Sequence, residues 1–168
     1  NALQQPRFDF VHEVSSEIPV RVLCRLLAVP DEDRNKLTSW GDRLVGHPDP
    51  GLAAVLLGSE ESEEYRLVPF RSPAALEVFE YGRSVQAERR AEPTGDLITR
   101  LVEAEVDGEP LSQQDLDNYF LLLALAGQET TRQAITLAML TLIEQPQVLA
   151  RLQQQPELLK GPALDEML

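Results

Sequence analysis

The sequence of 168 residues contains a single cysteine, Cys24, which excludes an intrachain disulfide and a cysteine-rich metal site. A chain without disulfides suits a reducing compartment, so we expect a cytoplasmic protein. Aromatic residues make up only 5% of the chain, and the core is therefore expected to be aliphatic. The longest apolar run, Tyr119 to Gly127, is about half of the roughly 20 residues that a transmembrane helix needs. We expect no membrane contact.

Positive charge is scarce as well. Lys and Arg number 15 against 28 Asp and Glu, and the formal net charge is −13. Binding to nucleic-acid phosphates requires clustered Lys and Arg, so we expect no nucleic-acid partner. The most acidic stretch, with four Glu residues between Glu60 and Glu64, is interpreted as a solvated loop.

Helical periodicity recurs along nearly the whole chain, and no segment alternates between apolar and polar residues as a strand would. Between Gly46 and Arg71 the helical period fails, which predicts a long irregular connection. The fold class that follows is mainly α. Capping residues, prolines and first-turn acids place helix starts near Pro19, Asp31, Ser72, Gly95, Ser112, Pro146 and Pro162.

The most apolar segment follows a capping-box pattern at Ser112 to Asp115. No proline occurs between there and Ile143, and Gly127 is the only glycine. One long central helix over about 112–143 is therefore predicted, longer than any other in the chain. Its part from Leu121 to Ala126 is apolar all round, so we expect that part to be buried on every side.

The predicted helix then turns polar at mid-length, which is costly because each unsatisfied buried polar group costs about 1–3 kcal/mol. Ala126, Gly127 and Thr130 share one face of small residues, against which a flat group or another helix can lie. Gly127 weakens the helix, and the Thr130 hydroxyl can bond back to the carbonyl of Ala126, so a bend is expected. Glu129 lies beside this notch as a proton source. A plain helix–helix contact is the other interpretation of these residues.

The hexapeptide from Ala126 to Thr131 resembles the (Ala/Gly)-Gly-x-(Asp/Glu)-Thr-(Thr/Ser) signature in the central helix of haem-thiolate monooxygenases, the cytochromes P450 of bacterial type. Ala163 to Leu168 resembles the approach to the family's Glu-x-x-Arg motif, in which Glu166 would be the structural glutamate. The resemblance covers essentially the whole chain and implies the central part of the P450 fold. Further stretches that resemble bacterial members are Ile18 to Leu27, Val29 to Arg34, Trp40 and Ile143 to Pro146.

The resemblance implies two catalytic residues. Thr130 would stabilise reduced oxygen at the haem through its hydroxyl, and Glu129 would relay protons to it. The segment from Gly46 to Arg71 would be the mobile lid over the substrate channel. The remaining assignments are Ala126, Gly127 and Thr131 beside the cofactor and dioxygen, and Leu122 and Leu125 against the substrate.

The resemblance also implies haem b as the cofactor, dioxygen and an apolar small-molecule substrate, and electrons from ferredoxin and ferredoxin reductase. A sterol, a terpenoid or a fatty chain is the expected kind of substrate. We expect residues 1–168 to be a single incomplete domain, inactive alone, with the haem-binding loop and its thiolate Cys outside the chain. Cys24 lies on an apolar stripe and His12 and His47 are isolated, so no metal site is expected within the chain. The alternative from another class is a cofactor-free helical regulatory or assembly domain.

Overall fold

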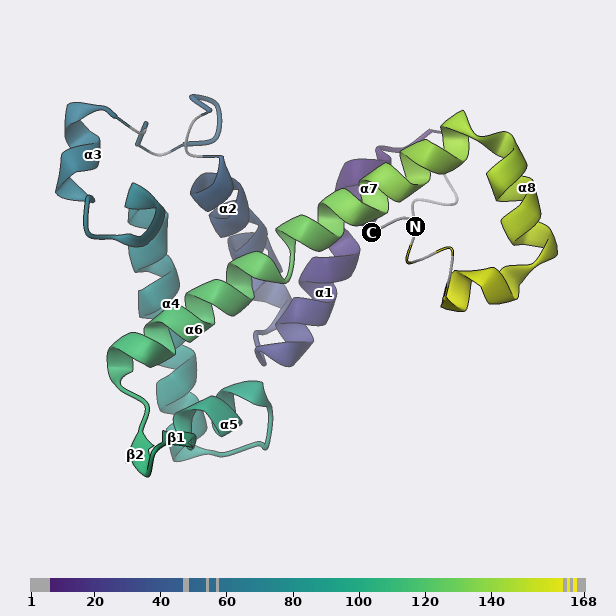
Figure 1. Ribbon diagram of the computed structural model, residues 1–168. Coiled ribbons are helices and arrows are strands. Elements are labelled where there is room, and N and C mark those ends of the chain that lie inside the picture. The colour runs from purple at the N-terminus through teal and green to yellow at the C-terminus, as the bar shows by residue number, and fades with distance from the viewer. Residues whose placement is uncertain are drawn as a thin grey trace. The chain divides into compact units, whose positions relative to one another are not determined.

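The computed structural model describes residues 7–46, 49–53, 55–56, 58–161, 163 and 165 (Figure 1). Most of these residues are helical, which confirms the mainly α fold class. The helices are the π-helical turn η2 (Val11–Ser15), α1 (Glu17–Leu26), the 3₁₀ turn η3 (Asp31–Asp33), α2 (Arg34–Val45), α3 (Glu60–Glu64), the 3₁₀ turn η4 (Pro69–Arg71), α4 (Pro73–Ala91), α5 (Leu97–Val102), α6 (Gln113–Ala126), α7 (Glu129–Glu144), α8 (Pro146–Gln154) and the 3₁₀ turn η5 (Pro156–Lys160).

The chain divides into two compact units. Unit 2 comprises residues 19–128, and in it α4 packs against α2, α5 and α6, while α2 also packs against α6. Unit 1 comprises residues 1–18 and 129–168, and in it α7 packs against η2 and α8. No helix in the described part of the chain is long and apolar enough to cross a membrane.

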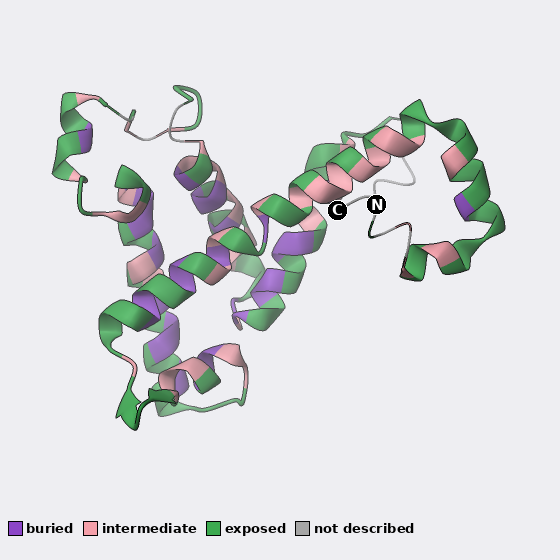
Figure 2. Ribbon diagram, in the orientation of Figure 1, coloured by how far each residue is buried: buried purple, intermediate pink, exposed green. Residues whose placement is uncertain are grey.

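The core of unit 2 is aliphatic, as the shortage of aromatic residues predicts, and it lies where α2, α4 and α6 meet (Figure 2). The largest fully buried side chain is Phe120 of α6, at 1% exposure. Gly82 of α4 faces it so closely that a Cβ atom there would lie 2.8 Å from the Phe120 ring. The core also contains five fully buried aliphatic residues, Leu27, Leu37, Leu44, Val78 and Ile98.

Three of the predicted helix starts in unit 2 are confirmed by their caps. The Ser72 hydroxyl accepts a hydrogen bond from the backbone N–H of Ala74, one residue after Pro73. The Asp96 carboxylate accepts from the N–H of Thr99 at the start of α5. At the start of α6 the capping box is complete, because Ser112 and Asp115 each accept from the other's backbone N–H. These side chains satisfy backbone donors that have no partner inside the helix.

The prediction of one uninterrupted long helix is wrong. A helical stretch does start after Ser112 and end at Glu144, but α6 ends at Ala126 and α7 begins at Glu129. The longest helix is α4, with 19 residues. The interruption has a physical cause, because the two residues between the helices include the glycine that weakens the helix. At the next residue, the Gln128 N–H donates to the carbonyl of Leu125, three residues earlier, rather than to the carbonyl four residues earlier as in an α-helix.

Two other predictions need correction. Strands were not expected, but β1 (Glu105–Val106) and β2 (Glu109–Pro110) form a small antiparallel hairpin. Its turn is made by Asp107 and Gly108, both with positive φ, and two-residue strands are too short to leave a sequence period. The acidic stretch that was interpreted as a loop is the exposed helix α3, capped by Ser59.

The predicted connection between Gly46 and Arg71 is therefore not wholly irregular, since it contains α3 and η4. Phe70 and Arg71 at its end both have left-handed backbone conformations, with φ of 59° and 48°. Such a conformation is uncommon for residues other than glycine and is strained for bulky side chains. Position 47, the start of the predicted last helix at position 162, and Glu166 lie outside the described residues.

Candidate functional site

The signature from Ala126 to Thr131 spans the interruption between α6 and α7. Ala126 is the last residue of α6, and the Gly127 N–H donates to the carbonyl of Leu123 over 3.3 Å. Glu129 opens α7. The signature residues through Gln128 belong to unit 2, and those from Glu129 belong to unit 1. A change in the helix at Gly127 was expected, and the structure has an interruption there.

Gly127 is also a point of close packing. A Cβ atom at this position would lie 3.1 Å from the carbonyl oxygen of Leu123 and 3.2 Å from the side chain of Leu23 in α1. Both distances are tighter than ordinary van der Waals contact, so a larger residue would push α1 and α6 apart. Helix packing is thus a role of Gly127 that the sequence analysis did not assign.

Glu129 is held by two side chains of its own helix. Its carboxylate lies 2.7 Å from the guanidinium of Arg132, and Gln133 Nε2 also donates to it over 3.3 Å. The Glu129 side chain is 18% exposed and that of Arg132 is 24% exposed. An acid in the first turn of a helix is favoured by the helix dipole. The spacing of three residues between Glu129 and Arg132 allows this ion pair in a helix, but it was not predicted from the sequence.

Thr130 and Thr131 follow in the first turn of α7, and both are exposed. A threonine six residues further along α7 shows what a hydroxyl does when it bonds to the helix backbone. Thr136 donates to the carbonyl of Arg132, four residues earlier, over 2.8 Å. The structure thus provides a second threonine, on the same helix and outside the signature, for comparison with Thr130.

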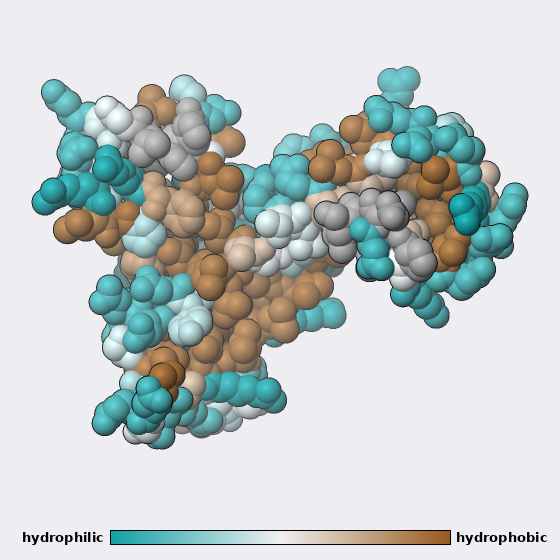
Figure 3. All heavy atoms as spheres, in the orientation of Figure 1, coloured by the Kyte–Doolittle hydropathy of each residue, from teal (hydrophilic) through white to brown (hydrophobic). Residues whose placement is uncertain are grey.

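The expected complete burial of residues 121–126 is wrong. Leu121 and Ala124 are buried, Leu125 is half-buried against the core, and Leu122 is 58% exposed. Within unit 2, α6 packs against α4 and α2, and that side of it carries the buried residues. Figure 3 shows apolar side chains gathered over α1 and the adjoining part of α6. The two residues that were expected to touch substrate are therefore partly or largely accessible.

Cys24 does not offer a metal ligand. It is 1% exposed within the core of unit 2, and burial raises the pKa of its thiol, with the Asp31 carboxylate as a second cause. A raised pKa disfavours the thiolate, which is the form that binds metals. Among the residues that the structure describes, no three His, Cys, Asp or Glu side chains are grouped as metal ligands.

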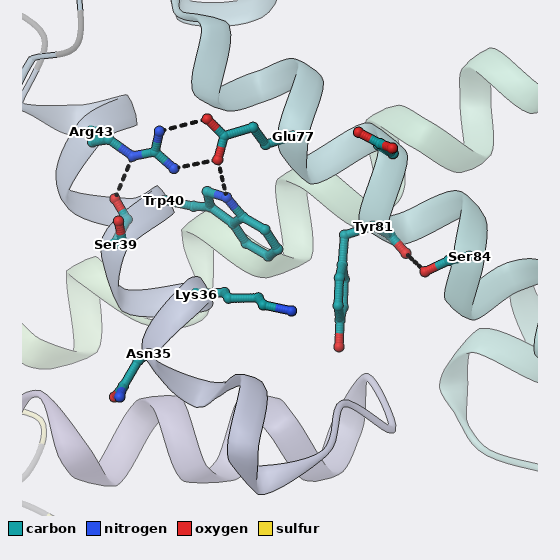
Figure 4. A pocket seen from close by; sticks show the side chains of 9 residues that line it. Asn35, Lys36, Ser39, Trp40, Arg43, Glu77, Tyr81 and Ser84 are labelled. Carbon is teal, nitrogen blue, oxygen red and sulfur yellow. Dashed lines mark hydrogen bonds and ion pairs between the residues drawn. The ribbon is translucent and has the colours of Figure 1, made fainter.

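A pocket of about 600 Å³ lies between α2 and α4 (Figure 4). Glu77 is one of the residues that line the pocket. Its carboxylate accepts two hydrogen bonds of 2.6 Å from Arg43 and one of 3.0 Å from Trp40 Nε1. The Arg43 guanidinium, and then the Trp40 N–H, hold the pKa of Glu77 below its usual range against the opposing effect of burial. Tyr81 packs on Trp40 with ring centroids 5.3 Å apart and donates to Asp33. These pairings join α2 to α4.

A second pocket, of about 580 Å³, is lined by residues 67–69 and by α4 and α6. Its polar wall contains the buried carboxylate of Asp117, which receives hydrogen bonds from Arg83 and from Gln113. Neither pocket includes a residue that the sequence analysis assigned to the site.

The comparison with known protein families now decides the family. Residues 50–159 match the model of the family described as cytochrome P450. The chain belongs to the cytochrome P450 family. Among curated relatives, a steroid C26-monooxygenase of Mycolicibacterium smegmatis is 35% identical to this P450 chain, over 86% of the chain and 31% of the relative. A methyl-branched lipid omega-hydroxylase of Mycobacterium tuberculosis is 33% identical, over 83% of the chain and 30% of the relative.

Solved structures of the family are similar in the same way. A Mycobacterium marinum cytochrome P450 in complex with pseudoionone matches 92% of this P450 chain and 35% of its own, with a TM-score of 0.75 and 32% identity. The cytochrome P450 PksS of the Bacillus subtilis bacillaene polyketide synthase matches 98% of this chain and 38% of its own, with a TM-score of 0.79 and 29% identity. The P450 chain spans about a third of the length of the curated relatives that it matches.

Proposed function

We propose that this P450 chain is the oxygen-activating part of a haem-dependent monooxygenase, which inserts one oxygen atom from dioxygen into an apolar substrate. The observation that carries the proposal is the position of the signature from Ala126 to Thr131 at a helix interruption, in a chain of this family. The interruption puts an acid and an alcohol, Glu129 and Thr130, side by side in the first turn of α7.

The residues before the interruption fit a flat cofactor. Ala126 and Gly127 are exposed and have small side chains or none, so a broad ring can approach α6 there. A bound haem supplies oxygen binding and one-electron chemistry. Its thiolate ligand must be a cysteine other than Cys24, since that thiol is enclosed in the core and disfavours the charged form.

Glu129 and Thr130 would hold and move the proton. Arg132 pairs with the carboxylate of Glu129 and thereby holds it in place in the first turn of α7. The next residue, Thr130, carries a hydroxyl that can both accept and donate a hydrogen bond. An acid and a neighbouring alcohol of this kind are the groups that general acid catalysis requires.

The proposed substrate is an aliphatic, lipid-like molecule of the sterol or fatty-chain class. Leu122 is largely accessible on α6 and lies one turn before the small residue Ala126, so it can offer an apolar surface next to the reacting position. Two relatives, named as a steroid C26-monooxygenase and a methyl-branched lipid omega-hydroxylase, support this class.

Ferredoxin and ferredoxin reductase are proposed as the electron donors, and the cytoplasm as the location. Both come from the family resemblance, and the single buried cysteine is compatible with a reducing compartment. The alternative of a cofactor-free regulatory or assembly domain is not favoured, because the family match extends over most of the chain.

Thr130→Ala in the full-length, haem-loaded enzyme tests the proposal. We expect haem and substrate binding to change little, while product per reductant falls by about 10²-fold and hydrogen peroxide rises, because a general acid contributes about 10²- to 10⁴-fold. The matched control is Thr136→Ala on the same helix, whose hydroxyl bonds only to the helix backbone in the structure. Unchanged product per reductant in the Thr130 variant would show that Thr130 has no catalytic role and serves only in helix packing. The absence of a thiolate absorption band in the reduced, carbon-monoxide-bound wild-type protein would overturn the haem assignment itself.

A further inference from the structure

Gln128 occupies the variable position of the signature, to which the sequence analysis assigned no role. Its side chain is buried, with the residue 6% exposed, although it lies between two helices rather than within one. Its amide Nε2 donates a hydrogen bond of 2.8 Å to the backbone carbonyl of Leu37 in α2, 91 positions earlier in the chain. A carbonyl oxygen has two lone pairs, so that of Leu37 can accept this bond in addition to its helical one.

Gly41 makes the contact possible. A Cβ atom on this residue of α2 would lie 2.6 Å from Gln128 Nε2, closer than real Cβ atoms approach other atoms, and 3.1 Å from its Cδ, which is tighter than most such contacts. Gly41 has an ordinary helical backbone and is buried within α2, where alanine is the better helix former. The glycine thus leaves room for the Gln128 amide on the surface of α2.

The hydrogen bond to Leu37, at 2.8 Å, is shorter than two backbone bonds at the interruption. The backbone bonds there are long, with 3.3 Å from Gly127 to Leu123 and 3.4 Å from Gln128 to Leu125. Moving Gln128 away from α2 would leave a buried amide unpaired, which is costly, whereas the backbone bonds alone hold the turn weakly. The side chain therefore selects one conformation of the residues around it.

We infer that Gln128 is a positioning residue for the reaction: its amide holds the helix interruption against α2, so that the backbone directly before Glu129 and Thr130 has one conformation. The inference rests on the proposed function, because positioning matters only if those two residues move a proton. It also gives α2 a role, because Leu37 and Gly41 support the residue that directly precedes Glu129.

Four variants of the full-length, haem-loaded enzyme test the inference. Gln128→Met keeps the length of the side chain and removes the donor. Gly41→Ala keeps Gln128 but fills the space that its amide needs. The double variant combines both changes. The control is Gly82→Ala, whose Cβ would crowd Phe120 to 2.8 Å at another helix contact, between α4 and α6.

Two readouts are measured. We expect product per reductant to fall by about 3- to 10-fold in Gln128→Met and in Gly41→Ala, because small displacements of reacting groups are costly. The double variant should be no worse than either single one, since both remove the same contact. Amide hydrogen exchange in residues 126–131 should rise by about 5-fold, the factor that one lost hydrogen bond is worth. Gly82→Ala should lower the thermal midpoint and leave product per reductant and exchange in this segment unchanged.

Wild-type product per reductant in Gln128→Met, together with a stability loss like that of Gly82→Ala, would show that Gln128 only packs. Unchanged exchange in residues 126–131 would show that the bond to Leu37 does not hold the interruption. The exchange experiment needs no turnover, so it tests the inference even if the wild-type protein proves not to oxidise any substrate. In that case the proposed function fails while the positioning of the segment is still measured.

Discussion

Helices α6 and α7 follow one another in the chain, and both are rich in apolar residues. They differ in how far those residues are buried (Figure 2). Five residues of α6 are buried, and three of them, Phe120, Leu121 and Ala124, belong to the hydrophobic core of unit 2. No residue of α7 is buried, and Leu137, Leu140 and Ile143 are each exposed by 46% or more. Among the described residues of unit 1, Leu152 is the only buried hydrophobic one. An apolar sequence therefore indicates that a helix has a surface to bury. Whether that surface is buried depends on the elements that pack against the helix.

Truncating the core residue of α6 is expected to have the largest effect on this comparison. Phe120→Ala should lower the free energy of unfolding by about 3–5 kcal/mol, because it removes a fully buried ring and leaves a cavity beside Gly82. Denaturant unfolding of the 168-residue chain measures the loss. A change below about 1 kcal/mol would show that unit 2 is not packed as the structure describes.

An intermediate effect is expected at Asp96, within the same unit. Burial raises the pKa of this carboxyl. Hydrogen bonds from Thr94, Thr99 and Arg89 outweigh that effect and hold the pKa of Asp96 well below its usual range. Asp96→Asn keeps a capping side chain but loses the charge that binds the Arg89 guanidinium, so we expect a loss of about 1.5–3 kcal/mol at neutral pH.

The pH dependence gives this prediction its sign. The folded-state pKa of Asp96 lies below the unfolded value of about 4, so its stabilisation is complete above about pH 4 and is lost as the pH falls towards the folded value. Unfolding of the Asn variant should therefore depend less steeply on pH in that range. The control is Glu77→Gln, whose ion pair with Arg43 is half exposed and should contribute only about 0.5–1 kcal/mol. Equal acid sensitivity of wild type and Asp96→Asn would contradict the assignment.

The smallest effect is expected in α7. Leu137→Ala should change the unfolding free energy of the 168-residue chain by no more than about 0.5 kcal/mol, because the side chain is 55% exposed. Amide exchange in α7 should also be faster than in α6. A loss of 2 kcal/mol or more would mean that the apolar side chains of α7 are packed in solution. The same substitution in a longer form of the protein would show whether further chain covers them.

Local chemistry made a large part of the fold predictable. The starts at Ser72, Asp96 and Ser112 were found because their side chains satisfy backbone donors within three residues, which needs no knowledge of the rest of the molecule. Leu37, Trp40 and Leu44, which are buried, recur with the helical spacing that places apolar residues on one face. The hairpin at Asp107 was missed because two-residue strands have no period.

The candidate site divides in the same way. The sequence by itself determined the signature from Ala126 to Thr131, which six neighbouring residues carry, and the family, which the match over residues 50–159 shows. Only the tertiary structure could decide that the helix is interrupted there and that Gln128 reaches the carbonyl of Leu37. That contact joins positions 91 residues apart and depends on Gly41 leaving room in another helix. Capping and periodicity act within a few residues, whereas the pairing of a buried amide depends on which backbone the fold brings next to it.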